Sequence, residues 1–205
     1  RAFSPVLALA SLVVIPLRTG PSDADLVGLQ WIQPDGAKRF LTGTAKKGAY
    51  ALLGPAPEPG DWLAVGEGYA TCASVRMATQ WTAAVAFDAG NLLEVARALV
   101  RRYPGVRLVL LADDDHATPG NPGVTKATSA AKAARGHVAV PRFASSAPER
   151  GTDWNDLHVT EGLDVVRAQL LACRAEWEQA PPGPPPRPAA PGVIDGHFPG
   201  VEWVR

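Results

Sequence analysis

Three groups of acidic residues in this chain of 205 residues have the placement that metal-dependent chemistry requires. Each group follows a short apolar run: Glu67 follows 62–66, Asp88 follows 82–87, and Asp113-Asp114-Asp115 follow 106–111. Amphipathic helical patterns separate these runs, which is typical of strands in a parallel sheet with helices on both faces. Functional groups gather at the carboxyl ends of such strands, beside the point where the strand order reverses. We therefore expect these acids to lie close together.

The Asp triplet favours a divalent cation. In extended backbone Asp113 and Asp115 point to one side and Asp114 to the other. Two carboxylates about 4 Å apart repel each other by roughly 1 kcal/mol in water and by about 4 kcal/mol at an effective dielectric constant of 20. Because all the candidate ligands are oxygens, Mg²⁺ or Mn²⁺ is the expected ion. An isolated Asp run is also typical of a solvated loop or a helix cap, and an isolated Glu67 of a helix N-terminus.

Composition excludes several other classes. Twenty Lys plus Arg balance twenty Asp plus Glu, so bulk charge does not drive nucleic-acid binding, and any such contact must be local. Cys72 and Cys173 form no CxxC or Cys/His cluster, which excludes zinc and fits a cytoplasmic protein. The apolar stretch 4–17 is shorter than the roughly 20 residues of a membrane span, so it predicts core rather than membrane. The chain begins at Arg1 rather than Met, so we expect a piece of a longer protein.

The pattern predicts three parts. Residues 1–60 form a small strand-rich or mixed α/β subdomain, residues 61–179 an α/β catalytic domain, and residues 180–205 a Pro-rich linker and tail. The expected strands are 12–17, 26–33, 50–53, 62–66, 82–87, 106–111 and 137–140. One expected helix ends at Thr79, and three others span 92–103, 123–134 and about 160–179. Residues 144–152 are expected to be a polar loop.

A basic segment lies inside the first part. Residues 36–54 contain four cations and no acid, namely Lys38, Arg39, Lys46 and Lys47. We expect them to contact phosphate of a nucleotide or a template strand. A solvated loop is the alternative for each of them, and Lys126, on a predicted helix, is a weaker candidate of the same kind. Trp154, between Asp153 and Asn155, is a candidate for stacking on a base.

These segments resemble a known family. Val65-Gly66-Glu67-Gly68-Tyr69-Ala70 resembles the first Toprim motif, and Leu110-Leu111-Ala112-Asp113-Asp114-Asp115 resembles the Toprim DxD motif. Three further segments, 85–92, 120–127 and 151–157, resemble the branch found in primases of conjugative plasmids and phages. The resemblance covers roughly residues 61–175, and it implies a Toprim fold with a parallel Rossmann-like sheet.

The resemblance also implies the site residues. Glu67, Asp113 and Asp115 would be the catalytic and metal-binding acids, with Asp153 or Asp156 a further metal ligand. Many bacterial primases have an aspartate four residues after the motif glutamate, where this chain has Thr71, which leaves the number of ions open. Asp88 is more typical of a helix N-cap than of a ligand.

The first sixty residues resemble the subdomain that precedes Toprim in bacterial primase polymerase cores, on the segments 26–31, 38–41 and 46–50. The implied function is metal-dependent synthesis of short RNA primers by nucleotidyl transfer. Single-stranded DNA and ribonucleoside triphosphates are the implied partners, and a replicative helicase is a further candidate. Two alternatives stay open: a Toprim nuclease, in which the same acids direct water at a phosphodiester, and a non-catalytic module that binds single-stranded DNA.

Overall fold

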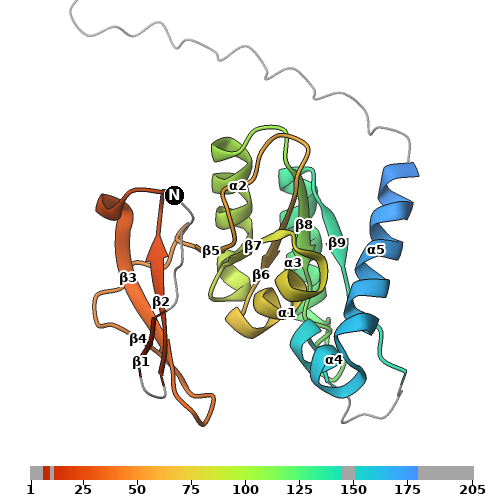
Figure 1. Ribbon diagram of the computed structural model, residues 1–205, viewed down its shortest axis with the longest axis horizontal. Helices are drawn as coiled ribbons and strands as arrows, with labels where there is room; N and C mark the ends of the chain where they lie inside the picture. The colour runs from red at the N-terminus through yellow and green to blue at the C-terminus, as the bar shows by residue number, and fades with distance from the viewer. Residues whose placement is uncertain (1–6, 10–11, 145–150, 180–205) are drawn as a thin grey trace, which may run out of the picture.

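The computed structural model describes residues 7–9, 12–144 and 151–179, and it contains two sheets (Figure 1). The smaller sheet is antiparallel, in the order β1-β2-β3-β4. Its strands are β1 (Leu7–Leu9), β2 (Leu12–Arg18), β3 (Leu26–Ile32) and β4 (Lys38–Phe40), and the 3₁₀ turn η1 (Asp23–Asp25) joins β2 to β3. The strand-rich start of the chain thus forms a sheet of its own. The Pro-rich tail predicted from residue 180 lies outside the described residues.

The larger sheet has the order β5-β7-β6-β8-β9. Its strands are β5 (Ala51–Leu53), β6 (Trp62–Gly66), β7 (Thr82–Val85), β8 (Arg107–Leu111) and β9 (His137–Ala139). All neighbouring pairs are parallel except β5 with β7. β5 therefore pairs in the larger sheet although it precedes residue 61, where the sequence pattern placed the start of the catalytic domain. The chain passes from β6 to β7 on one side and later to β8 on the other, so the strand order reverses beside β6.

Helices cover both faces of this sheet (Figure 1). They are α1 (Tyr69–Thr79), η2 (Ala89–Asn91), α2 (Leu92–Arg102), α3 (Pro122–Ala134), α4 (Trp154–Glu161) and α5 (Leu163–Gln179). α1, α4 and α5 pack on one face through the core cluster of Ala64, Val109 and Leu111. α2 and α3 pack on the other through Leu63, Val65 and Leu110. Successive strand residues alternate between the two clusters, as the pleat requires, which confirms the predicted α/β class.

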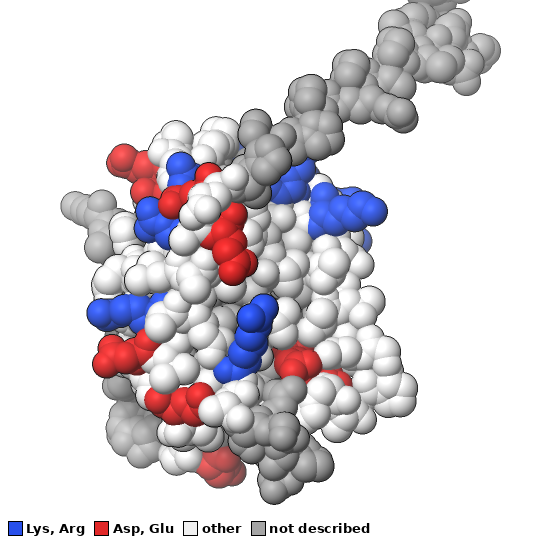
Figure 2. Space-filling model, turned by 90° about the vertical axis from the view of Figure 1, so that its right-hand side faces the viewer, with Lys and Arg blue, Asp and Glu red and all other residues white. Residues whose placement is uncertain are grey.

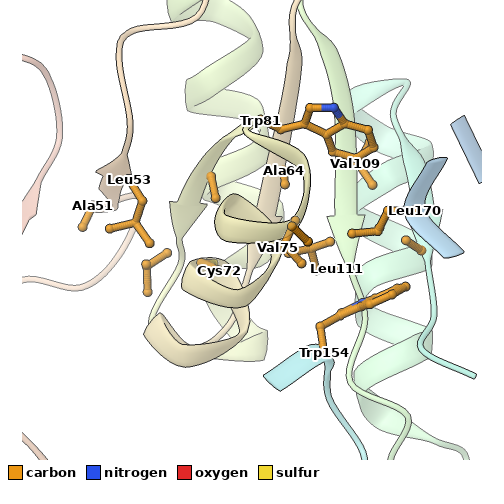
Figure 3. Close-up of a cluster of buried hydrophobic side chains, with 14 of the residues drawn as sticks. Ala51, Leu53, Ala64, Cys72, Val75, Trp81, Val109, Leu111, Trp154 and Leu170 are labelled. Atoms are coloured by element: carbon orange, nitrogen blue, oxygen red, sulfur yellow. The ribbon is translucent and has the colours of Figure 1, made fainter. Parts of the chain in front are cut away.

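Figure 3 shows the first of these clusters, in which Cys72 and Val75 of α1 approach the sheet beside Leu170 of α5 and Trp154 of α4. Trp154 has an exposed fraction of 0%. The suggestion that it stacks on a base is therefore wrong, because its ring is buried between helix and sheet. The apolar stretch at the start of the chain also contributes core, since Ile15 and Leu17 are completely buried. None of the described helices is long and apolar enough to cross a membrane.

The end of the chain differs from the sequence prediction. One helix from about residue 160 was expected, whereas the structure has α4 and α5, separated at Gly162. Asp153 caps α4, and the Asp156 side chain accepts hydrogen bonds from the Thr152 and Asp153 amides, which completes a capping box. Gly162 has a φ of 97°, a conformation that favours glycine and interrupts the helix.

Candidate active site

Acidic side chains from neighbouring strand ends face one pocket of about 210 Å³. Glu67 follows β6, Asp88 follows β7 and Asp113 follows β8, and these three strands are adjacent in the sheet. Asp153, at the start of α4, also lines the pocket. The fold thus brings several of the predicted acids together at this edge of the sheet, although neither Asp115 nor Asp156 lines the pocket.

Asp113 is the most perturbed of these acids. Its Oδ1 atom is buried and has no hydrogen-bond partner among the described residues. Burial, together with the charges of Glu67 and Asp153, raises the pKa of Asp113 to about 8. Burial likewise raises the pKa of Glu67, with the Asp115 charge as the second cause. Without a cation, the pocket therefore favours the protonated form of Asp113.

Asp115 is held by the start of α3. Its Oδ2 atom accepts a hydrogen bond from the Gly123 amide at 3.0 Å. A side chain at position 123 would collide with the carbonyl oxygen of Asp113, so glycine is required for the helix to approach this closely. Asn121 caps α3 and donates from Nδ2 to Asp114 Oδ1 at 2.7 Å. The Gly-Asn-Pro-Gly turn thereby orients the side chains of Asp114 and Asp115.

Asp153 is both a helix cap and a pocket residue. Its Oδ1 atom accepts hydrogen bonds from the amides of Asn155 and Asp156, each at 2.8 Å. Its Oδ2 atom accepts a hydrogen bond from Thr71 Oγ1, also at 2.8 Å. Thr71, which stands where many primases have an aspartate, is buried and acts as a neutral donor to this carboxylate. It thus positions Asp153 without adding negative charge.

The smaller sheet supplies a cation to the pocket. Lys38 on β4 lines it, and the Lys38 charge lowers the pKa of Asp113 against the stronger opposing effects. A Cβ atom at Gly68 would lie 3.6 Å from Lys38 Nζ, which shows how near the ammonium comes to the start of α1. Lys126 on α3 acts similarly on Glu67. Lys38 and Lys126 therefore act on Asp113 and Glu67 respectively.

The other three predicted cations differ from one another. Lys46 Nζ lies 3.1 Å from Asp88 Oδ2 and 5.0 Å from the centre of the Phe40 ring. Lys47 is exposed beside a second hollow, lined also by Asp88 and Glu94. Arg39 is exposed on β4, where its Nε lies 3.5 Å from Gln33 Oε1. On the face that carries α5, basic and acidic side chains are interspersed (Figure 2).

Asn91 ties the loop between β4 and β5 to the end of β7, beside the pocket. Its Nδ2 donates to the carbonyl oxygens of Lys46, Ala49 and Ala86, and its Oδ1 accepts from the Gly48 amide at 2.7 Å. The ring of Phe40 also meets the ring of Phe87 edge to face, with centroids 6.0 Å apart. Phe87 lines the pocket and has a φ of 71°, a strained conformation of the kind that collects at functional sites.

The donor set suits a hard cation only in part. Across residues 7–9, 12–144 and 151–179, no three acidic, histidine or cysteine side chains converge closely enough to hold an ion by themselves. Glu67, Asp113 and Asp115 thus do not form a ready three-ligand cage. Mg²⁺, however, usually keeps several waters and takes one or two carboxylates together with substrate phosphates. The unpartnered Asp113 oxygen amid neighbouring carboxylates fits that mode of binding.

Comparison with known proteins agrees with this geometry. A family model described as Toprim domain matches residues 62–164, half of the chain. The chain belongs to the Toprim family. The Toprim fold predicted from the Glu67 and Asp113–Asp115 motifs is thereby confirmed.

Two Escherichia coli proteins named DNA primase TraC are 43% and 40% identical to this Toprim chain over 122 residues. The match covers 57% of the chain but 12% and 8% of the relatives. The chain therefore spans a small part of those proteins.

Solved structures share the fold at low sequence identity. The primase fragment of the bacteriophage T7 primase-helicase protein is 15% identical, with a TM-score of 0.53 over 78% of this chain and 62% of that one. The DnaG catalytic core is 14% identical, with a TM-score of 0.52 over 79% and 53%. The two matches cover 78% and 79% of this chain. Residues 62–205 make up a smaller share than that, so both matches must include residues that precede β6.

Some pocket residues were not predicted from the sequence. Gln30 of β3 lines the pocket, as does Phe87, and neither belongs to a motif of acids or cations. Asn91 lies in the segment 85–92 that carries the family resemblance, but no role was predicted for its side chain. A polar residue at an inward position of a strand was the one available indication for Gln30.

Proposed function

We propose that this Toprim chain is the catalytic core of a DNA primase, which joins ribonucleotides on a single-stranded DNA template. The observation that carries the proposal is the composite pocket, in which Toprim acids face Lys38 and Gln30 of the smaller sheet. A Toprim domain alone has the acids. The match to primase structures reaches into the preceding segment, which supports primase over other Toprim activities.

We assign different roles to the basic and the acidic residues of the site. Lys38 and Lys126 draw nucleotide phosphates toward the pocket, because each already faces an acid there. Asp113, with Glu67 and Asp115 near it, would hold Mg²⁺ or Mn²⁺, with Asp153 as a further ligand. Such an ion, when bound, neutralises charge on the phosphoryl group under transfer. Glu67, whose pKa is raised, is suited to take the proton of the attacking hydroxyl group.

The template strand needs phosphate contacts outside the pocket. Lys46, Lys47 and Arg39 are exposed and do not line the acidic pocket, so we assign the template backbone to them. The structure of the DnaG primase catalytic domain bound to ssDNA has a TM-score of 0.51 with this chain, which supports single-stranded DNA as the partner. A replicative helicase is the further partner that this function would require.

The test is an incorporation assay with single-stranded DNA, labelled ribonucleotides and Mn²⁺. We expect short RNA oligomers from the wild type, none from Asp113→Asn, and wild-type yield from Asp35→Asn, which changes an exposed acid in the β3–β4 turn. Metal-dependent cutting of the DNA without incorporation would show that the chain is a nuclease. Binding of single-stranded DNA with neither reaction would favour the non-catalytic module.

A further inference from the structure

Gln30 occupies a position where the sheet calls for an apolar residue. On β3 it lies opposite Ile15 of β2 and opposite Phe40 of β4, and directly paired residues share one face of the sheet. That face is the one that packs against the Toprim core, as the complete burial of Ile15 shows. Gln30 itself is exposed by only 3%. A buried amide here weakens the core unless it finds a partner.

No described residue provides that partner. The Gln30 side chain makes no hydrogen bond within the part of the chain that the structure describes, although it has two donor hydrogens and an acceptor oxygen. It instead lines the acidic pocket, together with Lys38, Glu67 and Asp113. A polar group that is buried, unpartnered and turned to a pocket is the arrangement expected of a ligand-binding residue.

The chemistry of the pocket narrows the choice of ligand atom. Phosphates are acceptors and are matched by Lys38 and Lys126, while the carboxylates match a cation. An amide both donates and accepts, which complements a hydroxyl group. A template-directed enzyme must take all four bases, so a side chain that read one base edge would oppose its function. The sugar is the part of the nucleotide common to every substrate.

We infer that Gln30 hydrogen-bonds the ribose 2′-hydroxyl of the nucleotide bound in this pocket and so selects ribonucleotides over deoxyribonucleotides. The inference rests on the proposed primase function and adds to it a residue from the smaller sheet. Gln30 is a specificity residue and takes no part in the transfer itself. Loss of its amide should therefore affect ribonucleotides and leave deoxyribonucleotides almost unchanged.

The experiment compares Gln30→Met, which keeps the side-chain length without hydrogen bonding, with the wild type. The ratio of kcat/KM for ATP and for 2′-deoxy-ATP on a poly-dT template is the main readout, and the ratio of their Kd values by calorimetry is the second. We expect both ratios to fall about 10-fold, the size of one hydrogen bond. Gln33→Met is the matched control, because Gln33 follows the same strand and does not line the pocket.

Folding is measured beside activity. Because the Gln30 amide makes no hydrogen bond to a described residue, Gln30→Met should keep the thermal midpoint of the wild type while it lowers discrimination, a combination that general damage does not produce. Gln30→Leu makes the same test if the Met variant does not fold. An unchanged ratio, or equal loss on both nucleotides, overturns the inference and leaves the primase proposal intact. Absence of incorporation by the wild type overturns the proposed function and this inference together.

Discussion

Replacing Asp113 with Asn should stabilise the metal-free protein at high pH, in contrast to most substitutions at buried polar positions. The folded protein raises the pKa of Asp113 from 3.8 to about 8, by burial and by the charges of Glu67 and Asp153. The folded-state pKa lies above the unfolded one, so ionisation opposes folding. The penalty is absent below pH 4, grows as the pH rises toward 8, and is complete above that value.

The magnitude follows from the shift. Each pKa unit corresponds to about 1.4 kcal/mol, and solvent in the pocket screens part of the total, so we expect a gain of about 2 to 4 kcal/mol at pH 9. Asp113 Oδ1 makes no hydrogen bond to a described residue, so the amide loses no bond that this oxygen made. At pH 4 the variant and the wild type should have nearly the same stability.

The assay is thermal or urea unfolding in EDTA at pH 4, 7 and 9, with Asp35→Asn as the control for an exposed acid. The series is then repeated with Mn²⁺. A bound ion stabilises the folded state in proportion to the logarithm of its concentration over Kd, so the order of the two proteins should reverse at neutral pH. A variant less stable than the wild type in EDTA at pH 9, or equally stabilised by Mn²⁺, would refute the argument.

Two further predictions concern residues outside the Asp triplet. Lys47→Ala should lower the slope of log Kd for single-stranded DNA against log salt concentration by about 0.7, the value for one lost phosphate contact. Lys46→Ala should lower this slope less, because Asp88 already neutralises the Lys46 ammonium. Equal slopes in the wild type and both variants would mean that the two lysines are solvated and do not contact phosphate. Asp156→Ala should lower stability by about 1 kcal/mol, because it removes half of the capping box at α4, without changing Mn²⁺ affinity. A large drop in affinity, measured by calorimetry on the folded variant, would instead make Asp156 a metal ligand.

The larger sheet could be predicted well because each buried parallel strand is a continuous apolar run in the sequence. The runs at 62–66 and 106–111 became β6 and β8 nearly residue for residue. α4 was missed because its signal is a capping box, Asp153 to Asp156, which looks like an acidic loop when the helix after it is short. Its break from α5 depends on the positive φ of Gly162, which no periodicity records.

The acids of the pocket were predictable for the same reason, since each one ends a recognisable strand. Their chemistry was less so. The raised pKa of Asp113 depends on burial and on Asp153, which is remote in sequence and is brought near by α4. The bond from Thr71 to Asp153 joins two segments that local patterns treat separately. Gln30 was hidden because its neighbours along β3 are apolar, and a single polar residue in a strand is common.

Through the hydrogen bonds of its side chain, Asn91 connects two parts of the chain that lie beside the pocket. Its amide holds the backbone of residues 46–49 against the end of β7, at the edge of the sheet where the acids stand. Lys46 is thereby fixed beside Asp88 instead of moving freely with its loop. One buried side chain thus ties the loop that carries Lys46 to the sheet edge where the acids stand. Four hydrogen bonds of Asn91 thus tie the loop between β4 and β5 to the Toprim sheet, and the smaller sheet that this loop follows supplies Lys38 and Gln30 to the pocket.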